Sequence, residues 1–90
     1  MSNVTIWKYV IKCKDAQSVE LPKGAKILTL QMQYGLVCIW AEVDPDATLE
    51  DVVLLTVGTS HSLPLSRGKY IGTYQLEQGA LVFHVYEANY

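Results

Sequence analysis

The sequence is short of the residues from which metal sites and disulfide frameworks are built. Its 90 residues include two cysteines and two histidines, and Cys13, Cys38, His61 and His84 do not have the spacing of metal ligands. We therefore expect no bound metal and no cofactor. Each cysteine lies in an apolar, strand-like segment without a second pair nearby, which favours buried free thiols over a disulfide.

The sequence also lacks a strong charge of one sign and a long apolar run. Nine acidic and seven basic residues give a net charge of −2, which provides no general field for nucleic acid or an anionic membrane. No stretch approaches the roughly 18 apolar residues of a membrane helix, and the N-terminal segment has no basic leader. We expect a soluble, cytoplasmic protein that binds neither nucleic acid nor membrane.

What the sequence does contain is one stretch used twice. Residues 18 to 35, SVELPKGAKILTLQMQYG, align without a gap with residues 62 to 79, SLPLSRGKYIGTYQLEQG, at an offset of 44. Seven positions are identical in the two copies: Ser18/Ser62, Leu21/Leu65, Gly24/Gly68, Ile27/Ile71, Thr29/Thr73, Gln31/Gln75 and Gly35/Gly79. Two copies are too few for a solenoid. They predict a single domain, residues 1–90, with one repeat at about 4–43 and the other at about 48–87.

Short β-branched and aromatic segments between turn residues predict strands throughout. The predicted strands are residues 4–12, 18–21, 26–33, 36–43, 52–57, 69–77 and 80–87. Thr48 precedes Asp51 as in a capping box, so we expect at most one helical turn there. By the offset of 44, the strand at 52–57 should take the place of residues 8–13. The predicted fold class is all-β, a small barrel or sandwich of six to seven strands built from two pseudo-two-fold-related repeats.

Alternation within the two hairpins predicts which faces are buried. Val37, Ile39, Ala41 and Val43 are expected to face the core in the first hairpin, and Leu81, Phe83 and Val85 in the second. The opposite faces display Trp40 in the first hairpin and His84 at the equivalent position of the second. Spare apolar side chains, especially Trp7, Tyr9 and Trp40, favour a homo-oligomer, with a dimer preferred.

One loop has the composition of an anion site. Gly58-Thr59-Ser60-His61 offers backbone and hydroxyl donors, and Arg67 brings a guanidinium that suits a phosphate. Trp40 is a candidate for stacking on a nucleobase. The competing interpretation is structural: a polar turn, a solvated arginine at a corner, and a tryptophan in the core or an interface.

Catalysis has little support in the sequence. Ser60 and His61 are adjacent, which disfavours a nucleophile and base pair, and no third group is indicated. His61-Ser62-Leu63 is only faintly like a two-histidine phosphoesterase motif, because His84 is not followed by the required hydroxyl residue. We therefore expect a binding protein without catalytic residues.

Several segments together carry a family resemblance. They are Ile6–Tyr9, Leu21–Leu28, Trp40–Pro45, Gly58–His61, Tyr70–Gln75 and Gly79–Glu87. Over nearly the whole chain they resemble a family of small proteins encoded by tailed phages and prophages and long labelled as of unknown function. The family loop usually reads Gly-Thr-Gly-His-Pro, so Gly58, Thr59 and His61 match, whereas Ser60 and Ser62 replace the second glycine and the proline.

The resemblance implies a setting. Small phage proteins of this kind include sponges that sequester nucleotide signals of bacterial immune systems, and the chain is similar to the Sequestin type, which is aimed at signals from TIR-domain enzymes. This implies a non-enzymatic binder of an ADP-ribose-type or cyclic nucleotide in the infected host's cytoplasm, contacted by Trp40, Gly58, Thr59, Ser60, His61 and Arg67. Two alternatives stay open: a phage protein-interaction or structural module, and a small phosphodiesterase that degrades the signal.

Overall fold

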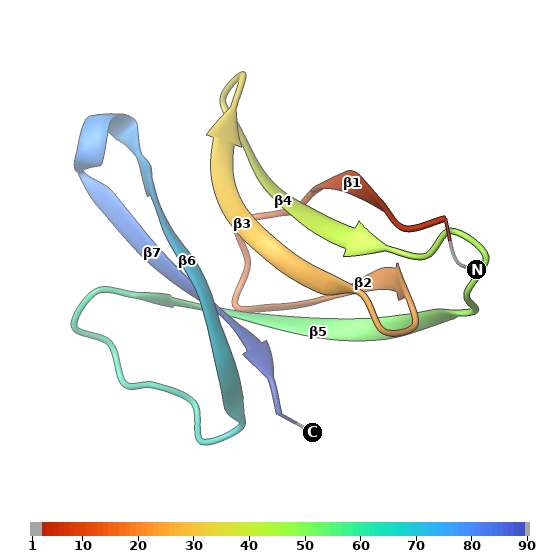
Figure 1. The fold of residues 1–90 in the computed structure, drawn as a ribbon. Helices are drawn as coiled ribbons and strands as arrows, with labels where there is room; N and C mark the ends of the chain where they lie inside the picture. Colours follow the sequence, from red (N-terminus) through yellow and green to blue (C-terminus); the bar gives the residue numbers. More distant parts are fainter. Residues whose placement is uncertain (1–2, 90) are drawn as a thin grey trace.

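Seven β-strands form two antiparallel sheets in the computed structural model, which describes residues 3–89 (Figure 1). The first sheet has the order β1-β4-β3, with β1 at Thr5–Val10, β4 at Leu36–Val43 and β3 at Lys26–Gln33. The second has the order β2-β5-β7-β6, with β2 at Ala16–Pro22, β5 at Leu49–Gly58, β7 at Leu81–Ala88 and β6 at Arg67–Leu76. A 3-10 turn, η1 (Glu77–Gly79), joins β6 to β7. The all-β prediction is confirmed as a sandwich; over residues 3–89 the sheets do not close into a barrel.

The two halves of the chain repeat one another in strand order and in hairpin register. β1-β4-β3 has the same order as β5-β7-β6. Thr29 faces Trp40 in the first hairpin as Thr73 faces His84 in the second, and a bulge precedes this pair in both. The duplicated sequence therefore builds the same hairpin twice.

The first strand of each half does not keep the hairpin offset. Thr5 faces Val43 in the first half, and Leu54 faces Glu87 in the second. The first strands therefore align at an offset of 49, while the hairpins align at 44. The place predicted for residues 52–57 is wrong by five positions, because the chain between the first strand and the hairpin is longer in the first half, where it contains a further strand, β2.

At most one helical turn was predicted at residues 48–51, and the structure has none there. β5 already begins at Leu49, which pairs with Pro22. The local capping signal of Thr48 and Asp51 competes with a ladder that pairs the backbone of this segment with β2. Pairing with β2 prevails because tertiary context overrides a weak local preference.

The core lies between the sheets and uses the faces predicted from alternation. It contains Ile11, Leu30, Val37, Ile39, Leu54, Tyr74 and Val85, and Phe83 packs against it. Ala41 and Val43 are buried as expected. Leu81 is 43% exposed, because it lies at the first position of β7 beside η1, where the sandwich ends.

The two cysteines differ from one another. Both are free, but Cys38 is buried and Cys13 is exposed. The prediction of a buried thiol is therefore wrong for Cys13, since β1 ends at Val10 and leaves this residue in the connection to β2. Within residues 3–89, no helix is long and apolar enough to cross a membrane.

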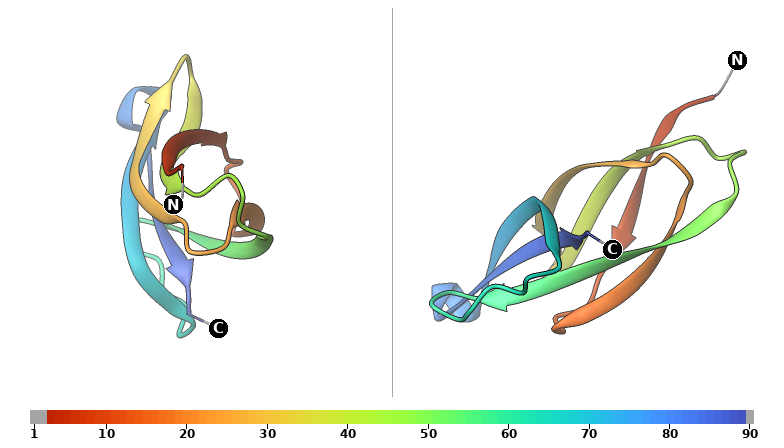
Figure 2. Two further views of the ribbon diagram at one scale, coloured as in Figure 1. Left: turned by 45° about the vertical axis from the view of Figure 1, so that its right-hand side comes forward. Right: turned by 90° about the horizontal axis from the view of Figure 1, so that it is seen from below.

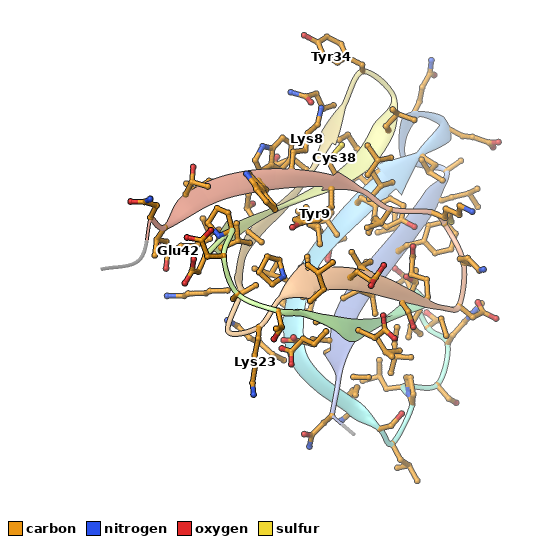
Figure 3. The ribbon with its side chains drawn as sticks, turned by 90° about the vertical axis from the view of Figure 1, so that its right-hand side faces the viewer. Lys8, Tyr9, Lys23, Tyr34, Cys38 and Glu42 are labelled. Atoms are coloured by element: carbon orange, nitrogen blue, oxygen red, sulfur yellow. The ribbon has the colours of Figure 1, made fainter. Side chains whose placement is uncertain are left out.

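The sheets meet along β3 and β6, which run side by side (Figures 1 and 2). No ladder joins these two strands, so side-chain packing holds the seam. At its centre a Cβ added to Gly72 would lie 3.0 Å from the Cβ of Leu30. On the other side of the sandwich, the Tyr9 side chain lies between β1 and β2 (Figure 3).

Substitution of Gly72 by alanine tests the seam. The new methyl group would contact Leu30 at its Cβ, which cannot move without its strand, so we expect Gly72→Ala to lower the free energy of unfolding by about 1–3 kcal/mol. Urea denaturation measures the change. Gln75→Ala, on an exposed position of the same strand, should cost less than about 0.5 kcal/mol; equal effects would contradict a close-packed seam.

Tyr74 carries a hydroxyl group into the core. The residue is 3% exposed, and its hydroxyl has no hydrogen-bond partner among the described residues. Its ring packs against Phe83, with ring centroids 5.5 Å apart. Burial raises the pKa of the Tyr74 phenol well above 10.0, and the neighbouring Cys13 thiol adds to this effect. Burial likewise raises the pKa of Tyr9.

A raised tyrosine pKa predicts a loss of stability in alkali. The folded state holds the phenol proton more tightly than the unfolded state. The contribution of this proton to the free energy of unfolding is therefore complete below pH 10 and falls as pH rises towards the folded pKa. Tyr74→Phe should reduce this alkaline loss and, by removing an unsatisfied buried hydroxyl, raise stability at pH 7 by about 1 kcal/mol. Denaturation between pH 7 and pH 11 measures both effects. Tyr34→Phe, at a residue 94% exposed, should leave the pH profile unchanged.

Candidate functional site

The predicted loop Gly58–His61 folds as a tight turn at the end of β5. The His61 N–H donates to the Gly58 carbonyl at 3.1 Å, and the Thr59 N–H donates to the Val82 carbonyl at 3.3 Å. Ser60 has a φ of +74°, as a type II turn requires at its third residue. A glycine adopts this conformation more easily than a serine, so the turn explains why a glycine would suit position 60.

The imidazole of His61 lies directly over Gly58. A Cβ on Gly58 would come within 3.3 Å of the ring atoms Cε1 and Nδ1. A side chain at position 58 would press on the ring, so the bare backbone lets the imidazole lie this close. Gly58 also pairs with Phe83 on β7, so the imidazole is brought to the end of the core.

Two hollows share Gly58, His61 and Phe83 as part of their walls. The larger has a volume of about 530 Å³ and is completed by Asp15, Thr56, Val57, Ser62, Leu63 and Pro64. The smaller has a volume of about 380 Å³ and is completed by Thr59, Ala80, Leu81 and Val82. Their shared walls make His61 the polar side chain common to both hollows.

Thr56 lies in the wall of the larger hollow. It is 8% exposed, and its hydroxyl has no hydrogen-bond partner among the described residues. Its N–H donates to the carbonyl of Asp15 at 3.0 Å, just beyond the last pair of the β2–β5 ladder. The edge of β5 is thus uncovered from this point to Gly58, which leaves the hollow open.

A chain of hydrogen bonds fixes the Thr59 side chain on the face of the sheet that carries His84, opposite to the face that carries Phe83. The Thr59 hydroxyl lies 2.7 Å from Nε2 of His84, and the Thr73 hydroxyl lies 2.9 Å from Nδ1. The Tyr70 hydroxyl bonds to Thr73 in turn. No site role was predicted for His84 from the sequence. The alternation of side chains along its strand indicates the face on which it lies, but only the register of the hairpin shows that it lies opposite Thr73.

The predicted site residues lie in three places. Gly58, Thr59, Ser60 and His61 form the turn. Arg67 lines neither hollow around His61; its Nη1 donates to the Pro64 carbonyl at 3.1 Å and closes the end of the loop. Trp40 lies on the other sheet between Lys8 and Thr29 and lines neither hollow as well.

The donors left for an anion are fewer than the loop sequence indicates. The N–H groups of Thr59 and His61 are used within the protein. The exposed side chains of Ser60, His61 and Ser62 remain, so an anion would be held mainly by an imidazole and hydroxyls. Over residues 3–89, no group of three or more His, Cys, Asp or Glu side chains is placed to hold a metal ion.

A third hollow shares no lining residue with the two hollows around His61. Its volume is about 390 Å³, and Tyr9, Lys12, Lys14 and Gln17 contribute to its walls between β1 and β2. The Gln17 side chain is tied to the backbone N–H and C=O of Lys12 at 3.0 and 2.6 Å. Surface lysines alone do not define a ligand, so His61 remains the centre of the candidate site.

Comparison with known proteins gives a family but no activity. A family model described as a domain of unknown function (DUF7352) matches residues 2–90. No curated protein and no solved structure matches the chain.

The position of His61 depends on the bare backbone of Gly58, and a pair of substitutions tests this. Gly58→Ala should displace the imidazole, visible as a changed His61 Hε1 chemical shift, at a cost below about 1 kcal/mol because a flexible side chain gives way. Ser60→Gly should leave that shift in place and raise stability by about 1 kcal/mol by relieving the positive φ. An unchanged His61 signal in Gly58→Ala would contradict the packing described.

Proposed function

Because the chain belongs to the family described as a domain of unknown function (DUF7352), we propose a function from the geometry of the site: the protein binds a small phosphorylated molecule beside His61 without turning it over. The observation that carries the proposal is the His61 imidazole, held over Gly58 between two hollows that both reach Phe83. A volume of about 530 Å³ lies within the range of about 300–1,000 Å³ usual for small-molecule sites.

The lining of the larger hollow supports a ligand with a ring and hydroxyl groups. Phe83 and the aliphatic walls suit a flat or apolar part, and the Asp15 carboxylate suits ribose hydroxyls but repels phosphate. The phosphate is therefore expected on the side of His61 and Ser62. Phe83 takes over the stacking role first considered for Trp40, and Arg67 acts by bracing the loop at Pro64.

A nucleotide has this combination of ring, hydroxyls and phosphate. Together with the resemblance to phage sponges, this supports a more specific proposal: a phage anti-defence protein that sequesters an ADP-ribose-type or cyclic nucleotide immune signal in the infected cell. Sequestration needs affinity and abundance, not chemical turnover. The adjacent side chains of Ser60 and His61 suit binding better than a nucleophile and base.

A hydrolase is the second candidate, favoured by the Thr59–His84–Thr73 chain. A hydroxyl 2.7 Å from an imidazole whose other nitrogen is also held resembles a nucleophile, a base and an orienting group. However, the orienting group is a threonine hydroxyl and not a carboxylate, so it stabilises an imidazolium poorly. The Thr59 N–H is also committed to Val82 and is lost as an oxyanion donor.

Calorimetry against ADP-ribose, cyclic ADP-ribose isomers and cyclic dinucleotides tests the proposal. We expect one of these ligands to bind, and His61→Ala to weaken binding by on the order of tenfold or more, equivalent to about 1.4 kcal/mol. Lys69→Ala, at an exposed cation near Arg67, should change the affinity by less than about threefold.

Recovery of the ligand separates binding from hydrolysis. Heat denaturation of the complex should release the ligand with its mass unchanged. A cleaved product that disappears with Thr59→Val would replace the sponge with a hydrolase. Failure of every ligand to bind would reject the nucleotide proposal.

A further inference from the structure

β1 has an unpaired edge whose hydrogen-bonding groups can be assigned. Among the described strands it pairs only with β4. The Ile11 N–H donates to Val37 at 2.9 Å, and the register makes these two residues directly opposed. Because bonding alternates along an antiparallel strand, the odd-numbered residues of β1 bond to β4. Ile6, Lys8 and Val10 therefore direct their N–H and C=O groups to the free side.

This edge lacks the features that usually prevent strand pairing. It has no proline, and its one charged residue is Lys8. The Lys8 ammonium donates to Gln33 Oε1 on β3 at 2.8 Å, so the charge lies over the sheet, away from the edge. Ile6, Trp7 and Val10 are 56%, 42% and 53% exposed. Natural edges are commonly blocked by lysine, proline or bulges, and β1 has none of these in place.

We propose that this edge pairs with β1 of a second copy of the chain, antiparallel, to give a continuous six-stranded sheet. The two copies would be related by a two-fold axis perpendicular to the sheet, which leaves each side chain on the same face of the sheet. At the centre of the pairing, one residue of β1 must therefore lie opposite the same residue of the second copy. Centring on Lys8 opposes two ammonium groups directly, which is unfavourable. Centring on Ile6 gives three hydrogen-bonded pairs, among residues 4–8 of the described chain, whereas centring on Trp7 gives four, among residues 4–10.

The register centred on Trp7 uses the whole strand. Ile6 then pairs with Lys8 of the second copy, and Val4 pairs with Val10, each twice by symmetry. Four such pairs of two bonds make about eight backbone hydrogen bonds. The two Trp7 side chains meet in a non-hydrogen-bonded pair, the closer of the two kinds, where aromatic side chains interact well.

Charge also favours a second copy as the partner. On the outer face, Ile6 is flanked by Glu42 of β4, so Lys8 of the second copy lies one strand away from Glu42. On pairing, the Lys8 side chain would leave Gln33 of its own sheet, cross Ile6 of the other copy and reach that carboxylate, and the symmetry provides the pair twice. The strand is therefore complementary to itself in hydrogen bonding, in aromatic contact and in charge.

Sedimentation equilibrium tests the dimer directly. The wild-type chain should sediment at twice its mass of 10.1 kDa. Ile6→Lys places a lysine opposite Lys8 and should weaken dimerisation by on the order of tenfold or more, whereas Ile6→Glu should preserve it. Ser18→Lys, an exposed position on β2, is the matched control and should have no effect. Circular dichroism establishes that each variant is folded.

A cysteine cross-link tests the register. In a Cys13→Ser background, Trp7→Cys should form an intermolecular disulfide on mild oxidation, because opposed residues lie about 4.5–5.5 Å apart at Cα. Ile6→Cys should not, since Ile6 is displaced by two residues from its own copy. A monomeric wild type, a dimer insensitive to Ile6→Lys, or preferential linking at position 6 would overturn the proposal. None of these measurements involves a ligand, so they are independent of the proposed function.

Discussion

The packing of β3 against β6 is the constraint on which the rest of the structure depends. No ladder joins the two sheets along this line, and Leu30 can approach β6 closely only because position 72 has no side chain. This seam brings the two hairpins into one core. It also leaves β1 and β2 as free borders on the opposite side of the sandwich (Figure 3). The unpaired edge of β1 is thus a consequence of closing the sandwich on one side only.

The two repeats share one backbone arrangement but carry different side chains at equivalent positions. Trp40 and His84 occupy equivalent positions opposite Thr29 and Thr73. In the first half the position holds an aromatic side chain between a lysine and a threonine. In the second half His84 bonds to hydroxyls on both sides, including Thr59 in the connection that leads to β6. The difference between Trp40 and His84 therefore places a group of hydrogen-bonded polar side chains at one end of the second sheet.

The sequence predicted which residues form the turn after β5, but not which side chains lie beside them in space. The four residues Gly58–His61 were recognisable as a group because they are contiguous and polar. Phe83 was predicted to face the core and had no site role, because its proximity to His61 arises from the pairing of β5 with β7. Arg67 lies six residues after the end of this turn in sequence, yet it bonds to Pro64 and does not line the hollows. Nearness along the chain was a poor guide to nearness in space.

The sequence by itself determined the strands, the two hairpins, their repeat, the buried face of β4 and, apart from Leu81, that of β7, because alternation and turn chemistry are local properties. The tertiary structure alone decided that β5 starts at Leu49, that Cys13 is exposed, that the His61 ring packs on Gly58 and that His84 bonds to Thr59. These features depend on which strands become neighbours. Strand neighbours are chosen by burial over the whole core, and no local pattern in the sequence records that choice.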